Sequence, residues 1–141
     1  MKKLFLFLSV AFLVMKAQSQ ISLPKIDPKA AASALSSFVK PPAIGDIGKT
    51  TGSIVTELAT KLALPATQKP ALTEAIGGFL KDKSSILSLA GTNPTQYLAK
   101  FNPLQSGLFS KIKGIVGAAK FADFLKLKPS SATGALSNLF F

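Results

Sequence analysis

Apolar residues recur every three to four positions through most of residues 53–128, which is the spacing of one face of an α-helix. The clearest run is Leu104–Leu125, LQSGLFSKIKGIVGAAKFADFL. Its apolar side chains share one side of the helix as far as Ala119, and Phe121 and Phe124 then fall on the polar side. We therefore predict a central helix followed by a turn into a second aromatic contact, with the apolar side buried.

Capping residues divide the rest of the pattern into further helices. Asp27-Pro28, Asn93-Pro94 and Asn102-Pro103 each place a side-chain acceptor before a proline, the usual start of a helix. Thr67 is a further predicted N-cap. Lys83 interrupts an apolar stripe, so we expect a kink or restart there. The predicted helices cover residues 28–39, 53–64, 68–90 with that interruption, 94–101 and 104–119.

No stretch alternates like a β-strand, so the predicted fold class is all-α: a small irregular bundle of five or six short helices after a cleaved signal peptide. One helical core domain is expected at residues 53–128. A flexible lead, a short helix and a Pro/Gly linker at 20–52 precede it, and a C-terminal tail at 129–141 follows. The apolar side chains of this tail are expected in the core: Leu136, Leu139 and Phe140.

The N-terminal stretch MKKLFLFLSVAFLVMKAQSQ has the features of a signal peptide. Lys2 and Lys3 precede an apolar run at Leu4–Val14, and Ala17-Gln18-Ser19 is a small-x-small cleavage site. An apolar run this short does not span a bilayer, which needs roughly 20 residues. We therefore expect a signal peptide at residues 1–19, export to the periplasm or cell exterior, and no transmembrane span in the mature chain.

The charge is strongly positive and comes entirely from lysine. The sequence has 17 Lys, no Arg and 6 acidic residues, a net charge of +11. Cleavage after Ser19 would remove three Lys and leave 14 − 6 = +8. A solvated lysine-rich surface accounts for this excess, and specific nucleic-acid recognition is not expected without Arg. The alternative is contact with an anionic membrane surface through Lys111, Lys113 and Lys120 on an amphipathic helix at 104–120.

Few residues are suited to catalysis or metal binding. The chain has no His and no Cys, so it lacks the commonest general base and metal ligand, thiol nucleophiles and disulfides. The acids lie at caps, in linkers or on solvent faces, where Lys61 and Lys81 can pair with Glu57 and Glu74. Gly48-Lys49-Thr50 matches the end of a P-loop, but no strand precedes it, so we interpret it as a helix N-terminus. We predict no enzyme activity, no cofactor and no metal site.

Five glycines fall inside predicted helices, where each costs roughly 1 kcal/mol relative to Ala. One explanation is a close approach or a bend that serves a membrane or partner. The other, which we favour, is tight packing between helices of a small bundle. These glycines are Gly77, Gly78, Gly107, Gly114 and Gly117.

Three segments carry a resemblance to a wider class of proteins: LALPATQKPALTEAIGGFL, PTQYLAKF and GLFSKIKGIVGAAKFADFL. Over residues 55–127 the chain resembles small exported bacterial helical proteins of unknown function. The resemblance implies an all-α bundle and assigns no functional residues. We therefore expect a non-enzymatic interaction or structural module of the cell envelope, with an envelope protein as partner. The alternative is a cationic peripheral protein on an anionic lipid surface.

Overall fold

The computed structural model describes residues 35–141, and within this range the fold is all-helical, with five α-helices and no β-strand. The predicted all-α class is therefore confirmed. The predicted signal peptide and the start of the lead lie outside the described residues. The helices are α2 (Ile47–Lys61), α3 (Lys69–Ile86), α4 (Leu89–Thr92), α5 (Pro94–Val116) and α6 (Ala118–Lys126), with 3₁₀ turns η1 (Ala66–Gln68) and η2 (Ala135–Leu139).

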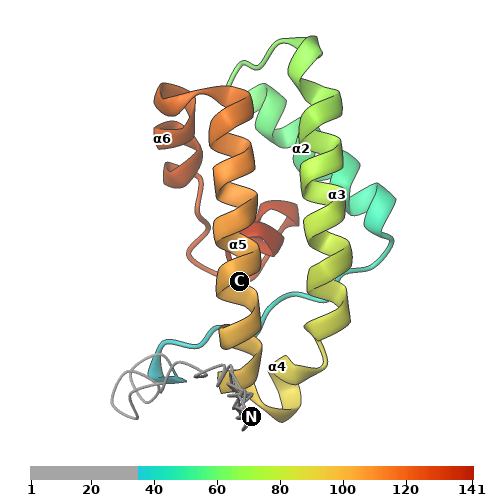
Figure 1. The fold of residues 1–141 in the computed structure, drawn as a ribbon, viewed down its shortest axis with the longest axis vertical. Helices are drawn as coiled ribbons and strands as arrows, with labels where there is room; N and C mark the ends of the chain where they lie inside the picture. Colours follow the sequence, from blue (N-terminus) through green and yellow to red (C-terminus); the bar gives the residue numbers. More distant parts are fainter. Residues whose placement is uncertain (1–34) are drawn as a thin grey trace, which may run out of the picture.

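The long helices α3 and α5 lie side by side along the long axis of the molecule (Figure 1). Helix α2 crosses behind α3, and α6 lies beside the upper end of α5 (Figure 1). The apolar sides of α2, α3 and α5 meet in one core, because each has apolar residues at helical spacing on a single side. Its fully buried members include Ile54, Leu58, Leu72, Ile76, Leu80, Ile112 and Leu139.

Helix α2 begins at Ile47, six residues before the predicted start at Ser53. The Asp46 side chain accepts a hydrogen bond of 2.7 Å from the Lys49 backbone N–H, which satisfies a donor that the first turn leaves free. The last residues assigned to the linker, from Ile47 on, therefore belong to the start of a helix, whereas residues 41–46 are not helical, as predicted. Gly48-Lys49-Thr50 lies in that turn, which confirms the interpretation as a helix N-terminus.

The end of α2 is a Schellman turn rather than a proline stop at Pro65. The Leu64 N–H bonds to the Ala59 carbonyl at 2.9 Å, and the Ala63 N–H bonds to the Thr60 carbonyl at 3.4 Å. Ala63 has a positive φ of 48°, a conformation that costs an L-residue roughly 1–2 kcal/mol. The helix therefore ends at Lys61, three residues before the predicted Leu64.

Helix α3 runs through Lys83 to Ile86, and a new helix, α4, begins at Leu89. The predicted restart is therefore present, but it lies at residues 87–88 rather than near Lys83. Lys83 stays in the apolar stripe and is fully buried, because a neighbouring segment supplies a hydrogen-bond acceptor to it. The predicted N-cap at Thr67 is also wrong: Thr67 lies in η1, and Gln68 precedes α3 without a side-chain cap.

Helix α5 continues through Asn102-Pro103, where the sequence predicts a boundary between two helices. Its start is confirmed, since the Asn93 side chain accepts a 3.1 Å hydrogen bond from the Gln96 N–H. Pro103 cannot donate to the Ala99 carbonyl. Both residues are exposed, so water can reach that carbonyl, and the packing of Phe101 in the core holds the helix together across the proline.

The run Leu104–Leu125 is divided between two helices, as the change of apolar side predicts, but the break lies at Gly117 rather than at 119–122. Gly117 has φ 84° and ψ 163°, a conformation essentially restricted to glycine. Phe124 on α6 is then fully buried against Phe109 of α5, with ring centroids 5.3 Å apart. The second aromatic contact is confirmed.

The C-terminal segment completes the core. Leu136, Leu139 and Phe140 are buried, as predicted. The Gln105 side-chain amide of α5 donates a 2.9 Å hydrogen bond to the Leu139 carbonyl and fixes the segment in place. Of the predicted helix 28–39, residues 35–39 are described, and helical backbone ends there at Ser36.

Candidate functional site

The exposed surface between α3 and α5 is hollowed by two adjoining cavities of about 560 and 190 Å³. They have Ala75, Gly78 and Lys111 in common, so they form one groove, which we call the α3–α5 groove. Residues that contribute from α3 recur at four- and three-residue intervals, as do those from α5, because each set lies on one side of its helix. The groove is lined by Ala71, Glu74, Ala75, Gly78, Phe79 and Asp82 from α3, and by Pro103, Leu104, Gly107, Leu108, Lys111, Gly114 and Ile115 from α5.

Three helical glycines in this groove are not explained by packing within the chain. At Gly78, Gly107 and Gly114 a Cβ atom would meet nothing within 4 Å. Gly77 differs, because a Cβ there would lie 3.7 Å from the Thr51 hydroxyl of α2. This is an ordinary van der Waals distance, so Gly77 lies beside α2 but an alanine would also fit there. The tight packing favoured from the sequence therefore requires glycine at none of these four positions. Gly117 likewise faces open space, but its backbone conformation requires glycine.

The groove carries charge of both signs. Lys111 projects from α5, and Glu74 and Asp82 come from α3. Among the described residues none of the three forms an ion pair, so the predicted pairing of Glu74 with Lys81 is absent. Unpaired charges beside small apolar residues leave the groove able to form ion pairs with a binding partner.

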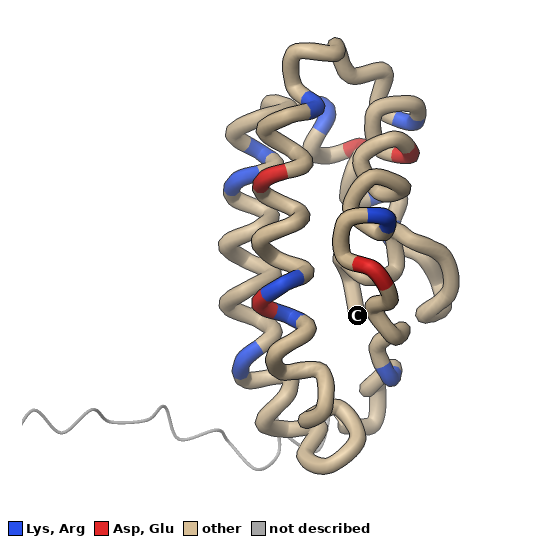
Figure 2. The backbone as a smooth tube through the Cα atoms, turned by 90° about the vertical axis from the view of Figure 1, so that its right-hand side faces the viewer, with Lys and Arg blue, Asp and Glu red and all other residues tan. Residues whose placement is uncertain are grey.

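The three lysines predicted to contact an anionic surface together, Lys111, Lys113 and Lys120, lie in different places and make different contacts. Lys111 lines the α3–α5 groove, and Lys113 is exposed two positions later, about 200° around the same helix. Lys120 donates hydrogen bonds of 2.6 and 3.3 Å to the Leu62 and Ala63 carbonyls, where it caps the end of α2. Figure 2 shows lysines distributed along several helices, with acidic positions between them.

The apolar side of the amphipathic 104–120 segment is not available to a lipid surface. Leu108, Ile112 and Val116 are all buried against the rest of the bundle. Within residues 35–141, no helix combines the length and the hydropathy of a membrane span.

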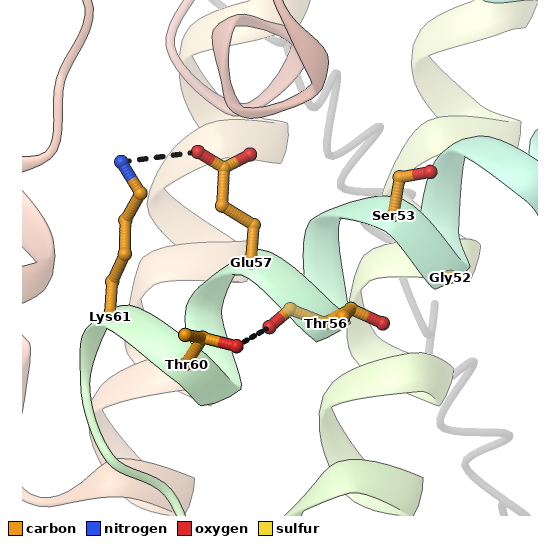
Figure 3. Close-up of a pocket in the computed structure, with 6 residues that line it drawn as sticks. All are labelled: Gly52, Ser53, Thr56, Glu57, Thr60 and Lys61. Atoms are coloured by element: carbon orange, nitrogen blue, oxygen red, sulfur yellow. Dashed lines mark hydrogen bonds and ion pairs between the residues drawn. The ribbon is translucent and has the colours of Figure 1, made fainter.

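A second hollow lies on the outer side of α2, and its two charged groups are already paired (Figure 3). Lys61 forms an ion pair with Glu57 at 3.2 Å, as the sequence predicts, and the Thr60 hydroxyl donates to the Thr56 carbonyl at 2.9 Å. All of its lining residues come from α2. This hollow therefore leaves fewer unpaired charged groups for a binding partner than the α3–α5 groove does.

The candidate acids for catalysis do not converge. Glu57 pairs with Lys61 on α2, Asp123 pairs with Lys126 on α6 at 2.9 Å, and Glu74 lines the α3–α5 groove. The described part of the chain holds no group of three or more acidic side chains arranged to bind a metal ion.

Lys83 is the one lysine that the structure buries completely within residues 35–141. Its Nζ donates a 2.8 Å hydrogen bond to the Asn138 carbonyl of η2 and lies 5.5 Å from the centre of the Phe101 ring. Burial lowers the pKa of Lys83 from 10.5 to about 7, because the apolar surroundings disfavour the ammonium form. The sequence signal for this group was its position inside an apolar stripe.

Comparison of the chain with protein-family models, with curated proteins and with solved structures finds no match.

Proposed function

We propose that this chain is an exported, non-enzymatic interaction module that binds a helix of a partner protein in the α3–α5 groove. The observation that carries the proposal is the set of open glycines at Gly78, Gly107 and Gly114. In a helix each glycine costs roughly 1 kcal/mol relative to alanine. No side chain inside the described chain uses the space that these glycines leave, whereas a partner backbone approaching closely would use it.

The groove also defines the chemistry of the partner. Its floor is made of small and apolar side chains, which suits a helix with an apolar stripe. Lys111 stands between the two cavities, and Glu74 and Asp82 lie along α3. A matching helix therefore has a carboxylate opposite Lys111 and a cation opposite the two acids, because unpaired charges at the contact oppose binding.

The test fills the groove with side chains. Gly78→Leu and Gly114→Leu place bulk where the partner helix lies, and Gly52→Leu makes the same change at an open glycine on α2. Binding is measured by capture from cell-envelope extract and by analytical ultracentrifugation for self-association. Photo-crosslinking from a diazirine-bearing lysine analogue at position 111, which keeps the length and charge of Lys111, locates the contact.

We expect one protein, or a second copy of this chain, to crosslink from position 111. We expect both groove variants to lose it and Gly52→Leu to retain it. Circular dichroism checks that each variant is folded. Equal capture by the groove variants and wild type, or no crosslink from position 111, would overturn the proposal.

A second candidate function is electrostatic adsorption to anionic lipid. The exposure of Lys111 and Lys113 favours it, together with the net charge of 14 − 6 = +8 that would remain after cleavage near Ser19. Cosedimentation with phosphatidylglycerol vesicles at low and high salt tests it. Binding at low salt that is lost at high salt supports adsorption, and no binding at either salt rejects it.

Export rests on the N-terminal sequence pattern. Mass spectrometry of the protein recovered from the producing cells is expected to show a chain that begins at Gln20. A full-length chain with Met1 or Lys2 at its N-terminus would contradict cleavage near Ser19.

A further inference from the structure

A separate groove of about 250 Å³ lies where residues 37–39, the first half of α5 and the C-terminal segment meet. It shares no residue with the α3–α5 groove. Aromatic side chains form much of its lining: Phe38, Tyr97, Phe101, Phe140 and Phe141. We call it the aromatic groove.

The aromatic rings in this groove pack against one another. Tyr97 stacks on Phe101 with centroids 5.4 Å apart and an interplanar angle of 13°, and Phe38 meets Tyr97 edge-on at 6.1 Å. Behind the stack, Phe101 contacts the Lys83 ammonium group. The apolar wall is therefore held in place by core contacts, which suits a site that receives a ligand without rearrangement of the helices.

The Tyr97 hydroxyl is the unexplained polar group of this groove. Tyr97 is 1% exposed, and its hydroxyl finds no hydrogen-bond partner among the described residues. Burial raises the pKa of Tyr97 above its ordinary value, so the hydroxyl remains protonated and able to donate. A buried donor without an acceptor costs free energy that an acceptor from a ligand would recover.

Lys128 gives the same groove a positive charge. Its Nζ lies 5.7 Å from the centre of the Phe141 ring, and it forms no ion pair within the described chain. The Gln105 amide already donates one of its two N–H groups to the Leu139 carbonyl. An acceptor with a negative charge therefore matches the two free groups, the Tyr97 hydroxyl and the Lys128 ammonium.

We propose that the aromatic groove binds a small apolar carboxylate. The carboxylate accepts a hydrogen bond from Tyr97 and pairs with Lys128, and the apolar body lies against Phe101 and Phe141. The Tyr97 oxygen is covered in the absence of ligand, so this binding mode requires a side chain of the groove wall to move. The half-buried Phe38, which contacts the Tyr97 ring edge-on, is the neighbour proposed to move. The volume of about 250 Å³ is below that of most drug-sized pockets, so the ligand is small.

The test uses octanoate as the probe and 1-octanol as its uncharged counterpart, with binding followed by ¹⁵N-resolved NMR titration and calorimetry. Tyr97→Phe removes only the hydroxyl, and Lys128→Gln removes only the charge. Lys113→Gln removes a charge from an exposed position of α5 outside the groove and serves as the matched control.

We expect octanoate to shift the amides of residues 97–105 and 138–141 and to bind more tightly than octanol. Tyr97→Phe is expected to weaken octanoate binding at least about tenfold. Lys128→Gln is expected to abolish the preference for octanoate over octanol, and Lys113→Gln to leave both unchanged.

A stability measurement separates a ligand role for Tyr97 from a structural one. Because its hydroxyl lacks a partner, Tyr97→Phe without ligand is expected to be at least as stable as wild type. A clearly lower melting temperature would show that the hydroxyl serves the fold and would overturn the proposal. So would the absence of octanoate binding at millimolar concentration, or equal affinities of wild type and Tyr97→Phe.

Discussion

The apolar surroundings of Lys83 change the pKa of its side chain. An ammonium group in an apolar core is costly unless it loses its charge or finds partners. Lys83 has one strong acceptor, the Asn138 carbonyl, and one aromatic face, that of Phe101. Its lowered pKa of about 7 means that the folded protein holds this side chain close to half-charged at neutral pH.

Stability should therefore depend on pH through Lys83. Between pH 7 and 10.5 the unfolded chain binds a proton that the folded chain does not, so the free energy of unfolding rises with pH by a few kcal/mol. Below pH 7 Lys83 is protonated in both the folded and the unfolded chain, so it adds no further dependence of the free energy of unfolding on pH. Urea denaturation from pH 5.5 to 9.5 measures it. The range stops there because the raised pKa of Tyr97 reverses the trend above pH 10.

Two variants test whether Lys83 causes this change of the free energy of unfolding with pH. Lys83→Met removes the titrating group from the core, so its stability should vary little over this range and exceed that of wild type at pH 6. Lys113→Met makes the same change on the surface and should keep the wild-type slope. An unchanged slope in Lys83→Met would show that another group titrates.

At the scale of elements, the glycines of α5 have opposite roles. Gly114 lies in a regular helix with open space around its Cα, whereas Gly117 has φ 84° and ends the helix. The same substitution should therefore have opposite effects at two positions three residues apart.

Gly114→Ala should raise the free energy of unfolding by about 0.5–1 kcal/mol, because alanine loses less backbone entropy in a helix. Gly117→Ala should lower it by about 1–3 kcal/mol, because alanine cannot adopt that conformation without strain. Thermal denaturation of both variants measures the two effects. Destabilisation by Gly114→Ala would mean that its surroundings are not open.

Helix existence could be predicted from the sequence, and several helix ends could not. The period of apolar residues identified α2, α3 and the separation of α6 from α5, and Asn93 marked the start of α5. The start of α2 was missed because Asp46 follows a Gly and Pro-rich stretch that resembles a loop. The continuity of α5 through Pro103 depends on tertiary packing of Phe101, which local signals do not contain.

The candidate sites could be predicted less well from the sequence than the helices could. Lysine counts indicated a charged surface but could not show that Lys120 caps another helix 58 residues away in sequence. Open glycines and packed glycines look the same in a sequence. The aromatic groove joins residues 37–39 to α5 and the C-terminal segment, and no spacing rule brings these three together.

At the scale of the whole molecule, the segment 135–140 is a structural part of the bundle. Leu139 is fully buried, and two side chains from α3 and α5, Lys83 and Gln105, bond to the backbone of this segment. We therefore expect Leu139→Ala to lower the free energy of unfolding by about 2–5 kcal/mol, the usual cost of a cavity at a buried leucine.

The exposed Leu125, at 44% exposure, provides the matched control. Leu125→Ala should change the free energy of unfolding by less than about 1 kcal/mol, since little apolar surface is lost. Urea denaturation compares the two variants. Similar small effects at both positions would mean that the C-terminal segment is not part of the cooperative unit.

The hydrogen bond from Lys83 to Asn138 joins residues 55 positions apart, and this separation has a consequence for the order of events during biogenesis. Until residues 135–140 arrive, the apolar stripe of α3 has a charged ammonium group in its middle that faces water. An incomplete bundle then cannot close its core without stranding that charge, so collapse is held back. The late segment supplies the hydrogen-bond acceptor for Lys83 and the missing apolar side chains in one step. Closure of the core therefore waits for residues 135–140.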